Sequence, residues 1–291
     1  MPEGHTLHRL AGTLNAAFAG TTPEVSSPQG RFASGAAKLN GRRFEHASAW
    51  GKHLFVEFAG DAYLHVHLGL IGVFEVTAYE RYAGPPTPAG QVRLRLAAPG
   101  VVADLRGATL CEVVTPEQVD DVVARLGPDP LRTDADPDLA WDRLRSSNRI
   151  VGELLMDQAV VAGVGNVFRC EVLFRHRVDP FRPGRQVRRS TWETIWEDLR
   201  LLLPIGVRLG QIVTMADQVH DALLGAYDAD AVPALGGVVS AWRPNPTGAL
   251  ERRFYVYKRQ GQPCHVCSSR VRTRVLAGRN LYWCGRCQRR R

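Results

Sequence analysis

The first residues of the chain combine a nucleophile with an acid. The sequence begins Met1-Pro2-Glu3-Gly4, and removal of Met1 would leave Pro2 with a free secondary amine beside the carboxyl group of Glu3. An N-terminal amine has a pKa near ~7.7 to 8.0, so a useful fraction is unprotonated at neutral pH and attacks carbonyl-like carbon. A secondary amine that attacks a sugar C1′ gives an iminium. Taken alone, a proline at position 2 is explained more simply by efficient removal of Met1.

Four cysteines near the C-terminus have the spacing of a zinc site. They form two CxxC pairs separated by sixteen residues: Cys264, Cys267, Cys284 and Cys287. Four thiolates at this spacing close tetrahedrally round Zn²⁺, and so small a segment has little apolar core without the metal. Disulfides are the competing interpretation, which an intracellular chain disfavours. Cys111 and Cys170 lie among apolar residues and are predicted to be buried thiols.

The charge of the chain is concentrated in the same C-terminal segment. The 291 residues carry a net charge of +8, and residues 252–291 contain twelve Lys or Arg and no Asp or Glu. A segment of one sign favours phosphate binding over a solubility role. Five aromatic residues are interleaved with these charges, and we expect them to form the core of a small module: Phe254, Tyr255, Tyr257, Tyr282 and Trp283.

Lysine is rare enough in this chain to be informative. There are 34 Arg but only three Lys, at positions 38, 52 and 258. A compact ammonium approaches a phosphate or a reacting centre where the broad guanidinium does not fit. Lys52 is therefore a candidate functional residue, although retention by chance on a solvated turn explains it equally well.

The patterns along the chain predict a β-rich part followed by a helical part. Apolar residues at helical spacing predict a first helix that ends near Gly20 and carries Pro2 and Glu3 at its N-terminus. Short alternating segments between residues 30 and 115 predict a β-sandwich or barrel. The strands expected there are Leu54–Phe58, Tyr63–Leu68, Val73–Val76 and Val92–Leu96.

The second part begins after a loop-like linker at residues 127–130. Helical patterns follow at Trp141–Leu144, Ile150–Val161, Val167–His176 and Trp192–Leu203, whereas residues 211–250 give no clear pattern. No signal peptide and no apolar run of the ~18 residues needed for a membrane span are present, so we expect a soluble intracellular protein.

A glycine-rich turn joins two of the predicted helices. The segment Val161-Ala162-Gly163-Val164-Gly165-Asn166-Val167 places Asn166 to cap the second helix. Backbone N–H groups at such a helix start, with an amide side chain, form a phosphate-sized pocket. An ordinary capped helix hairpin explains the pattern at least as well.

Together these motifs resemble the formamidopyrimidine-DNA glycosylase and endonuclease VIII family of base-excision repair enzymes. The resemblance covers nearly the whole chain and is weakest between residues 211 and 250. It rests on the order and separation of Met1-Pro2-Glu3-Gly4, Gly51-Lys52, His67-Leu68-Gly69-Leu70, Gly163-Val164-Gly165-Asn166 with Glu171, and the zinc finger with Arg279 five residues before Cys284.

The resemblance implies an α+β fold with three parts. These are an N-terminal two-sheet β-sandwich with flanking helices (residues 1–126), a helix-two-turn-helix domain (127–250) and a C-terminal zinc finger (251–291), with DNA held between domains. It also implies one structural zinc and no further cofactor. The expected partner is damaged DNA, double-stranded and in some cases single-stranded. We further expect a monomer in the cytoplasm of a bacterium, associated with the nucleoid.

The resemblance also implies roles for individual residues. Pro2 would attack C1′ of the damaged nucleotide and form a Schiff base with it, with Glu3 assisting ring opening and proton transfer. Lys52, Asn166 and Arg279 would hold phosphates around a flipped nucleotide. The iminium acidifies the C2′ protons, so β-elimination and then δ-elimination follow. The enzyme would be both a DNA glycosylase and an abasic-site lyase.

One departure from the family pattern bears on the lesion. In the branch that acts on 8-oxoguanine, a loop at a strand end has a sequence similar to Asp-Pro-Arg-Arg-Phe-Gly. At this place the present chain has Asp104-Leu105-Arg106-Gly107-Ala108-Thr109. Gly107 and Ala108 cannot fill the space that a flipped base leaves. The wedge would come from Leu70 and Ile71, as in the endonuclease VIII branch, which favours oxidised pyrimidines. His5 and Thr6 differ from many endonuclease VIII relatives.

Two other functions fit parts of the sequence. The chain would serve as a non-catalytic damaged-DNA-binding protein if its chemistry had been lost, although intact Pro2, Glu3 and Lys52 argue against that. It would serve as a glycosylase for bulky adducts or crosslinks if residues 211–250 formed a wide loop. One condition applies to any active form: with Met1 retained, the Pro2 nitrogen is a tertiary amide without a nucleophilic lone pair, so the active enzyme must start at Pro2.

Overall fold

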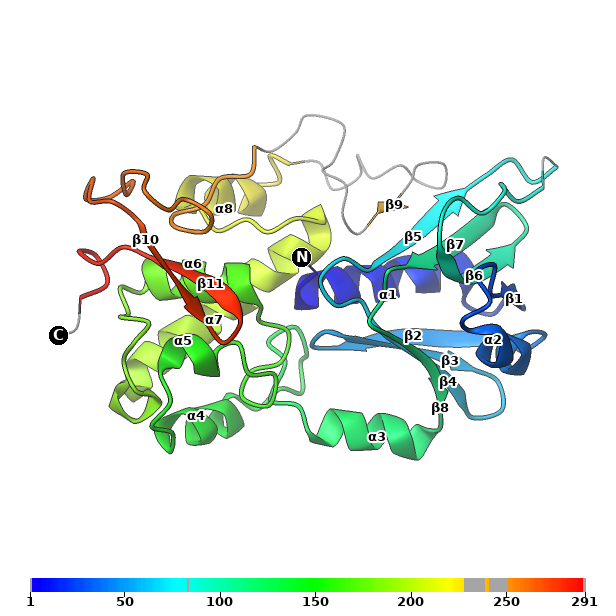
Figure 1. Cartoon of the computed structure of the whole chain (residues 1–291), viewed down its shortest axis with the longest axis horizontal. Helices are drawn as coiled ribbons and strands as arrows, with labels where there is room; N and C mark the ends of the chain where they lie inside the picture. Colours follow the sequence, from blue (N-terminus) through cyan, green and yellow to red (C-terminus); the bar gives the residue numbers. More distant parts are fainter. Residues whose placement is uncertain (1, 83, 228–238, 241–250, 290–291) are drawn as a thin grey trace. The chain divides into compact units, whose positions relative to one another are not determined.

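The computed structural model describes residues 2–82, 84–227, 239–240 and 251–289. The chain divides into two compact units (Figure 1). The first contains residues 2–125 and the short strand β9 (Val239–Ser240), and the second contains residues 126–227 and 251–289.

The first unit is built from two antiparallel sheets. One sheet has the order β1 (Glu24–Ser26), β6 (Val92–Ala98), β7 (Val101–Arg106), β5 (Val73–Ala78) and β9. The other has the order β2 (Phe44–Trp50), β3 (His53–Phe58), β4 (Ala62–His67) and β8 (Leu110–Val114). Three helices accompany them: α1 (Gly4–Phe18), α2 (Ala33–Leu39) and α3 (Pro116–Ala124). The four predicted strands are confirmed with small shifts at their ends.

Helix α1 forms because its apolar residues share one face, and that face is buried in the first unit. Leu7, Leu10, Leu14 and Phe18 are at most 4% exposed. The helix packs against β2 and β3 of one sheet and β5 of the other. Asn15 docks it on β2, since its side chain donates to the Ala47 carbonyl at 2.8 Å and accepts from the Ala47 N–H at 2.6 Å.

The second unit is helical with a terminal hairpin. Its elements are α4 (Pro137–Arg145), α5 (Val151–Leu154), α6 (Asn166–Arg175), the 3₁₀ turn η1 (Gly184–Gln186), α7 (Arg189–Leu209), α8 (Ala216–Leu223), β10 (Arg272–Leu276) and β11 (Arg279–Trp283). Trp192 and Trp196 of α7 lie in the main apolar cluster. A second cluster around Phe174 contains Tyr282, with Tyr255, Tyr257 and Trp283 packed against it, whereas Phe254 packs against the main cluster. The predicted packing role of these aromatic residues is confirmed. Within the described residues, no helix combines the length and apolar character needed to cross a membrane.

The prediction of one helix over residues 150–161 is wrong. Helix α5 ends at Leu154, and the following residues form turns. The Asp157 carboxylate accepts from the Ala159 N–H at 3.0 Å, and the Gln158 side chain accepts from the Gly163 N–H and donates to the Val164 carbonyl, both at 3.0 Å. Such local side-chain bonds offer the backbone an alternative to the helix, which an apolar pattern does not reveal.

Candidate catalytic and phosphate-binding sites

The N-terminal residues lie at the start of α1. Glu3 is the N-cap residue, with extended backbone (φ −124°, ψ 179°), and its carbonyl accepts from the Thr6 N–H at 2.9 Å. The Glu3 side chain makes no capping hydrogen bond and is 0% exposed, and Pro2 beside it is also buried. The structure therefore places a buried carboxyl group directly after Pro2 in the chain.

Lys52 lies in the two-residue turn between β2 and β3, where Trp50 pairs with His53. Helix α1 runs antiparallel to β2, since Asn15 bonds Ala47 and the Phe18 ring lies 5.9 Å from that of Phe44. From Asn15 to Gly4 the helix rises about 16.5 Å, and from Ala47 to Trp50, the last residue of β2, the strand rises about 10 Å in the same direction before the turn that carries Lys52. The N-terminus of α1 and Lys52 therefore lie at the same end of the first unit.

Two histidines and a glutamate extend from this turn across the sheet. His53 Nδ1 lies 2.9 Å from His65 Nε2, and His65 Nδ1 lies 3.2 Å from a carboxylate oxygen of Glu112. An ionised carboxylate only accepts, so neutral His65 donates from Nδ1 and accepts at Nε2. His53 then donates from Nδ1. Burial, followed by the nearby His65, His67 and Lys52, lowers the pKa of His53 to about 3.

His67 ends β4 directly opposite His53. Its Nδ1 accepts from the Gly69 N–H at 3.0 Å, so the neutral ring carries its proton on Nε2. Burial, then Lys52 and His65, lowers its pKa. The resemblance drew attention to His67, but sequence reasoning missed His53 and His65. The signal was present as histidines two residues apart on a predicted strand, which places them on one face of a sheet.

The predicted wedge residues lie on a tight turn between β4 and β5. The Gly72 N–H donates to the Leu68 carbonyl at 3.0 Å, and Gly69 has φ +68°. A side chain at Gly69 would meet Thr109 at 2.3 Å, so the turn requires glycine there. Leu70 is 46% exposed and Ile71 is 78% exposed. The turn therefore presents two neighbouring apolar side chains to solvent.

The loop from β7 to β8 carries no competing wedge. Arg106 donates to Asp104 at 2.9 Å and to Glu75 at 3.3 Å, which holds its guanidinium against the sheet. Gly107 has φ +62°, and a side chain there would come within 3.3 Å of the Ile71 carbonyl. The two loops are therefore neighbours, and only the Leu70–Ile71 turn offers large apolar side chains.

In the second unit, Asn166 is the first residue of α6, and Gly165 is the N-cap. The prediction that Asn166 caps the helix is wrong, because its side chain turns to the C-terminal hairpin. Its Nδ2 donates to the Asn280 carbonyl at 2.9 Å, and its Oδ1 accepts from Arg169. This bond places Asn166 next to the start of β11.

Arg279 is the first residue of β11, directly after the hairpin turn. Ala277 and Gly278 both have positive φ, 49° and 70°, as a two-residue hairpin turn of the primed type requires. The Arg279 guanidinium donates to the Gly278 carbonyl at 3.0 Å. The structure thus brings the two predicted phosphate-binding residues of the second unit to neighbouring positions, because Asn166 holds the residue that follows Arg279.

The segment leading into the finger is fixed to α6 by Glu171, which is 0% exposed. Its carboxylate accepts from the backbone N–H groups of Tyr255, Val256 and Tyr257 at 2.8 to 2.9 Å and from the Thr214 hydroxyl at 2.8 Å. Four donors compensate one buried carboxylate. The finger is therefore held to the helix that carries Asn166.

The four cysteines of the finger converge. Their sulfur atoms all lie within 4.8 Å of one another, with 3.9 Å between Cys264 and Cys287 and 3.4 Å between Cys267 and Cys284. Tetrahedral zinc with bonds of about 2.3 Å separates its sulfur ligands by about 3.8 Å, whereas a disulfide would need about 2.05 Å. The predicted structural zinc fits this site. Cys111 and Cys170 are buried free thiols, as predicted.

Comparison with known families identifies each part of the chain. Residues 1–111 match the formamidopyrimidine-DNA glycosylase N-terminal domain, residues 126–218 match the formamidopyrimidine-DNA glycosylase H2TH domain, and residues 261–290 match a zinc finger found in FPG and IleRS. These matches confirm the predicted α+β fold class, the order of its parts and the structural zinc.

Individual relatives agree with this result. The chain is 50% identical over 288 residues to endonuclease 8 1 of Mycobacterium tuberculosis, covering 99% of this chain and 100% of the relative. It is 30% identical over 262 residues to formamidopyrimidine-DNA glycosylase of Thermus thermophilus, covering 87% and 85%. The crystal structure of Lactococcus lactis Fpg in complex with DNA containing N7-benzyl-Fapy-dG has the same fold, with a TM-score of 0.76, 21% identity and coverage of 99% and 100%.

Proposed function

The chain belongs to the formamidopyrimidine-DNA glycosylase and endonuclease VIII family of DNA glycosylases and abasic-site lyases, and from this premise we propose that it excises oxidised pyrimidines through its N-terminal proline. The observation that carries the proposal is the placement of the buried Glu3 carboxyl and Lys52 at the same end of the first unit as Pro2. Damaged DNA is the proposed substrate.

The reaction begins with attack of the Pro2 amine on C1′ of the damaged nucleotide. The glycosidic bond breaks, its electrons leave with the base, and the base takes up a proton. The attacking amine loses its proton, the C1′–O4′ bond of the sugar ring breaks, and O4′ takes up a proton. The iminium, or Schiff base, that forms at C1′ makes a C2′ proton acidic. Loss of that proton expels the 3′ phosphate by β-elimination, and δ-elimination then releases the 5′ phosphate. Glu3 supports this sequence as the buried carboxyl group that exchanges protons with the opening sugar.

Lys52 is proposed to hold a phosphate next to the lesion. The neighbouring histidines support this role, because burial and their proximity to Lys52 and to one another lower the pKa of His53 and of His67. Neutral rings add no further charge beside the ammonium, and a neutral His67 offers an Nε2–H donor at the same end of the sheet. Asn166 and Arg279 are proposed to hold phosphates from the second unit.

Preference for oxidised pyrimidines is proposed from the wedge. Leu70 and Ile71 are exposed and apolar, whereas Arg106 is tied into ion pairs and Gly107 has no side chain. Apolar insertion into the base stack offsets part of the few kcal/mol lost when a base leaves it. The similarity to endonuclease 8 1 of M. tuberculosis supports the same branch. A protein with this substrate works in the bacterial cytoplasm at the nucleoid.

The test is borohydride trapping on DNA with an abasic site, using protein whose loss of Met1 is verified by mass spectrometry. We expect a covalent protein–DNA band, strongly reduced in Pro2→Gly and in protein that retains Met1. The matched control is Pro23→Gly, which changes a proline outside the site and should leave trapping intact. Absence of a band from correctly processed protein would refute the lyase mechanism.

Lesion choice is tested on the same protein with defined duplexes. We expect excision of thymine glycol to exceed excision of 8-oxoguanine by at least about tenfold, and Ile71→Ala to lower it without abolishing trapping on abasic DNA. Faster excision of 8-oxoguanine would contradict the assignment. The alternative substrate, a bulky adduct or crosslink, was tied to residues 211–250, most of which lie outside the described residues.

A further inference from the structure

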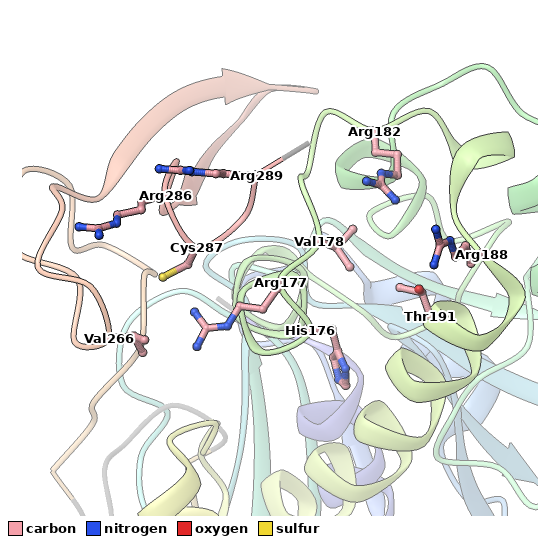
Figure 2. A pocket seen from close by; sticks show the side chains of 10 residues that line it. All are labelled: His176, Arg177, Val178, Arg182, Arg188, Thr191, Val266, Arg286, Cys287 and Arg289. Atoms are coloured by element: carbon pink, nitrogen blue, oxygen red, sulfur yellow. The ribbon is translucent and has the colours of Figure 1, made fainter. Parts of the chain in front are cut away.

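The second unit contains a cavity of about 660 Å³ that the proposed reaction does not use. Its lining comes from the C-terminal end of α6, the loop after it, the start of α7 and the two cysteine knuckles of the finger (Figure 2). The lining residues are His176, Arg177, Val178, Arg182, Arg188, Thr191, Val266, Arg286, Cys287 and Arg289.

Five of the ten lining residues are arginine and none is acidic. Figure 2 shows Arg182 and Arg188 on the helical side, and Arg286 and Arg289 on the finger side. The carboxylate that contacts the lining is Asp198, which bonds His176 at 3.1 Å and is already held by both ends of the Arg175 guanidinium. The charge of the cavity is therefore not balanced by acidic side chains in its lining.

The charge of several of these arginines is not neutralised by an acidic partner in the described residues. Within the described parts of the chain, ion pairs are absent for Arg177, Arg188, Arg286 and Arg289. Four thiolates around Zn²⁺ leave a formal charge of −2, which the two finger arginines can offset. Arg177 and Arg188 come from the helical part, and their positive charge is more than is needed to neutralise the metal site.

Arg177 is held in a costly backbone conformation. It follows the C-cap of α6 with φ +56°, where glycine is the favoured residue. A bulky residue there costs of order 1 kcal/mol, and strain of this kind is concentrated at functional sites. Its guanidinium lies 5.0 Å from the centre of the Phe174 ring, which fixes its direction at the cavity.

The N-terminus of α7 adds to the positive field. Arg188 is the N-cap residue of this 21-residue helix, and no acidic residue occurs in the first turn. The first N–H groups of a helix have no intrahelical partner and carry a partial positive charge. Thr191, in the first turn, lines the cavity with its hydroxyl-bearing side chain.

We propose that this cavity is a second phosphate-binding site, which takes a compact polyphosphate or the terminal phosphate of a nucleic-acid strand. Its volume lies in the range of small-ligand sites. Guanidinium groups that come from three elements suit a tetrahedral phosphate, whose oxygens accept from all sides, better than a planar carboxylate. The site is distinct from the Asn166–Arg279 region, because the two lie at opposite ends of α6, which is about 15 Å long.

The test is calorimetric titration of the zinc-loaded protein with pyrophosphate. We expect binding to the wild type that weakens at least about tenfold in Arg177→Gly and in Arg188→Gln, since each loses charge-assisted hydrogen bonds. Glycine suits the positive φ of position 177, so Arg177→Gly should keep or raise the melting temperature while it loses the ligand. The matched control is Arg200→Ala, which removes an exposed arginine of α7 outside the cavity and should bind as the wild type does.

A second probe distinguishes the source of the phosphate. A trinucleotide with a 5′ phosphate is compared with the same trinucleotide bearing a 5′ hydroxyl. If the wild type prefers the phosphorylated trinucleotide and Arg177→Gly loses that preference, the ligand of the cavity is the phosphate at a strand end. If pyrophosphate binds without such a preference, the ligand is a free polyphosphate. The proposal is overturned if neither phosphate probe binds the wild type, if binding persists in both cavity variants, or if an oligoaspartate binds the cavity in place of phosphate.

Discussion

The two units of the molecule hold their functional residues by different means. In the first unit one apolar cluster joins α1 to both sheets, and the candidate catalytic residues directly precede α1 or follow β2. In the second unit the candidate phosphate-binding residues depend on a buried carboxylate and a four-cysteine site. An apolar core holds side chains in place at any pH and without a metal. Cysteine–zinc bonds and hydrogen bonds to a buried carboxylate do so only while the metal is bound and the carboxylate keeps its charge.

This difference is tested most strongly by removing the zinc. Cys284→Ser should abolish stoichiometric zinc binding and unfold the finger, because so small a segment has little core of its own. Hydrogen exchange should then show loss of protection at β10 and β11, with protection retained at β2, β3 and β4. DNA binding should fall by more than about tenfold.

The control for this experiment is Cys111→Ser, which changes a buried thiol of the first unit. It should leave zinc content unchanged and lower protection in the β-sheets only. Equal loss of protection in both units after Cys284→Ser would show that zinc does not stabilise the finger independently of the first unit.

The next largest effect is expected from the carboxylate at α6. Glu171→Ala leaves the N–H groups of Tyr255, Val256 and Tyr257 without their acceptor in a buried place, at a cost on the order of 3 kcal/mol or more. The melting temperature should fall and zinc should be lost more readily to a chelator. Glu153→Ala, at a half-buried glutamate of α5 in the same unit, is the matched control. If Glu171→Ala lost zinc to the chelator at the same rate as the control, Glu171 would not stabilise the attachment of the finger to α6.

Features that depend on local spacing were predictable from the sequence, whereas features that depend on contacts between distant segments were not. Spacing alone located the cysteines, since a metal site needs only the right ligands at the right separation. Alternation located the strands of the first unit, because one face of each is buried. Hydrogen bonds from side chains to distant backbone groups could not be predicted from the sequence. The pattern around Asn166 predicts a helix cap, whereas in the structure its side chain bonds the Asn280 carbonyl of the hairpin. The Glu171 carboxylate accepts from backbone N–H groups more than eighty residues away. The cavity arginines come from three separated segments, so no local pattern could join them.

A smaller effect is expected at the hairpin of the second unit. Arg279→Ala should weaken binding to undamaged and damaged duplexes alike, by about tenfold, and should reduce the slope of log K against log salt by about 1. Arg274→Ala, on the neighbouring strand β10, is the control for general loss of charge. If Arg279→Ala left both affinity and salt slope unchanged, its phosphate contact would be excluded.

The last prediction concerns the histidines of the first unit and the dependence of stability on pH. His53 has a pKa of about 3 in the folded chain and the ordinary value of 6.5 when unfolded. Between these values the unfolded state binds the additional proton, so the free energy of unfolding decreases as pH falls below 6.5, by at most about 1.4 kcal/mol per pH unit. His53→Asn should therefore reduce the loss of melting temperature between pH 6.5 and pH 4.5, relative to His46→Asn, which removes an exposed histidine of β2. Because this histidine belongs to the first unit, the change should appear in the exchange of β3 and β4 and leave the finger unaffected. Identical pH dependence in the two variants would mean that the half-buried His53 does not limit the stability of the first unit in acid.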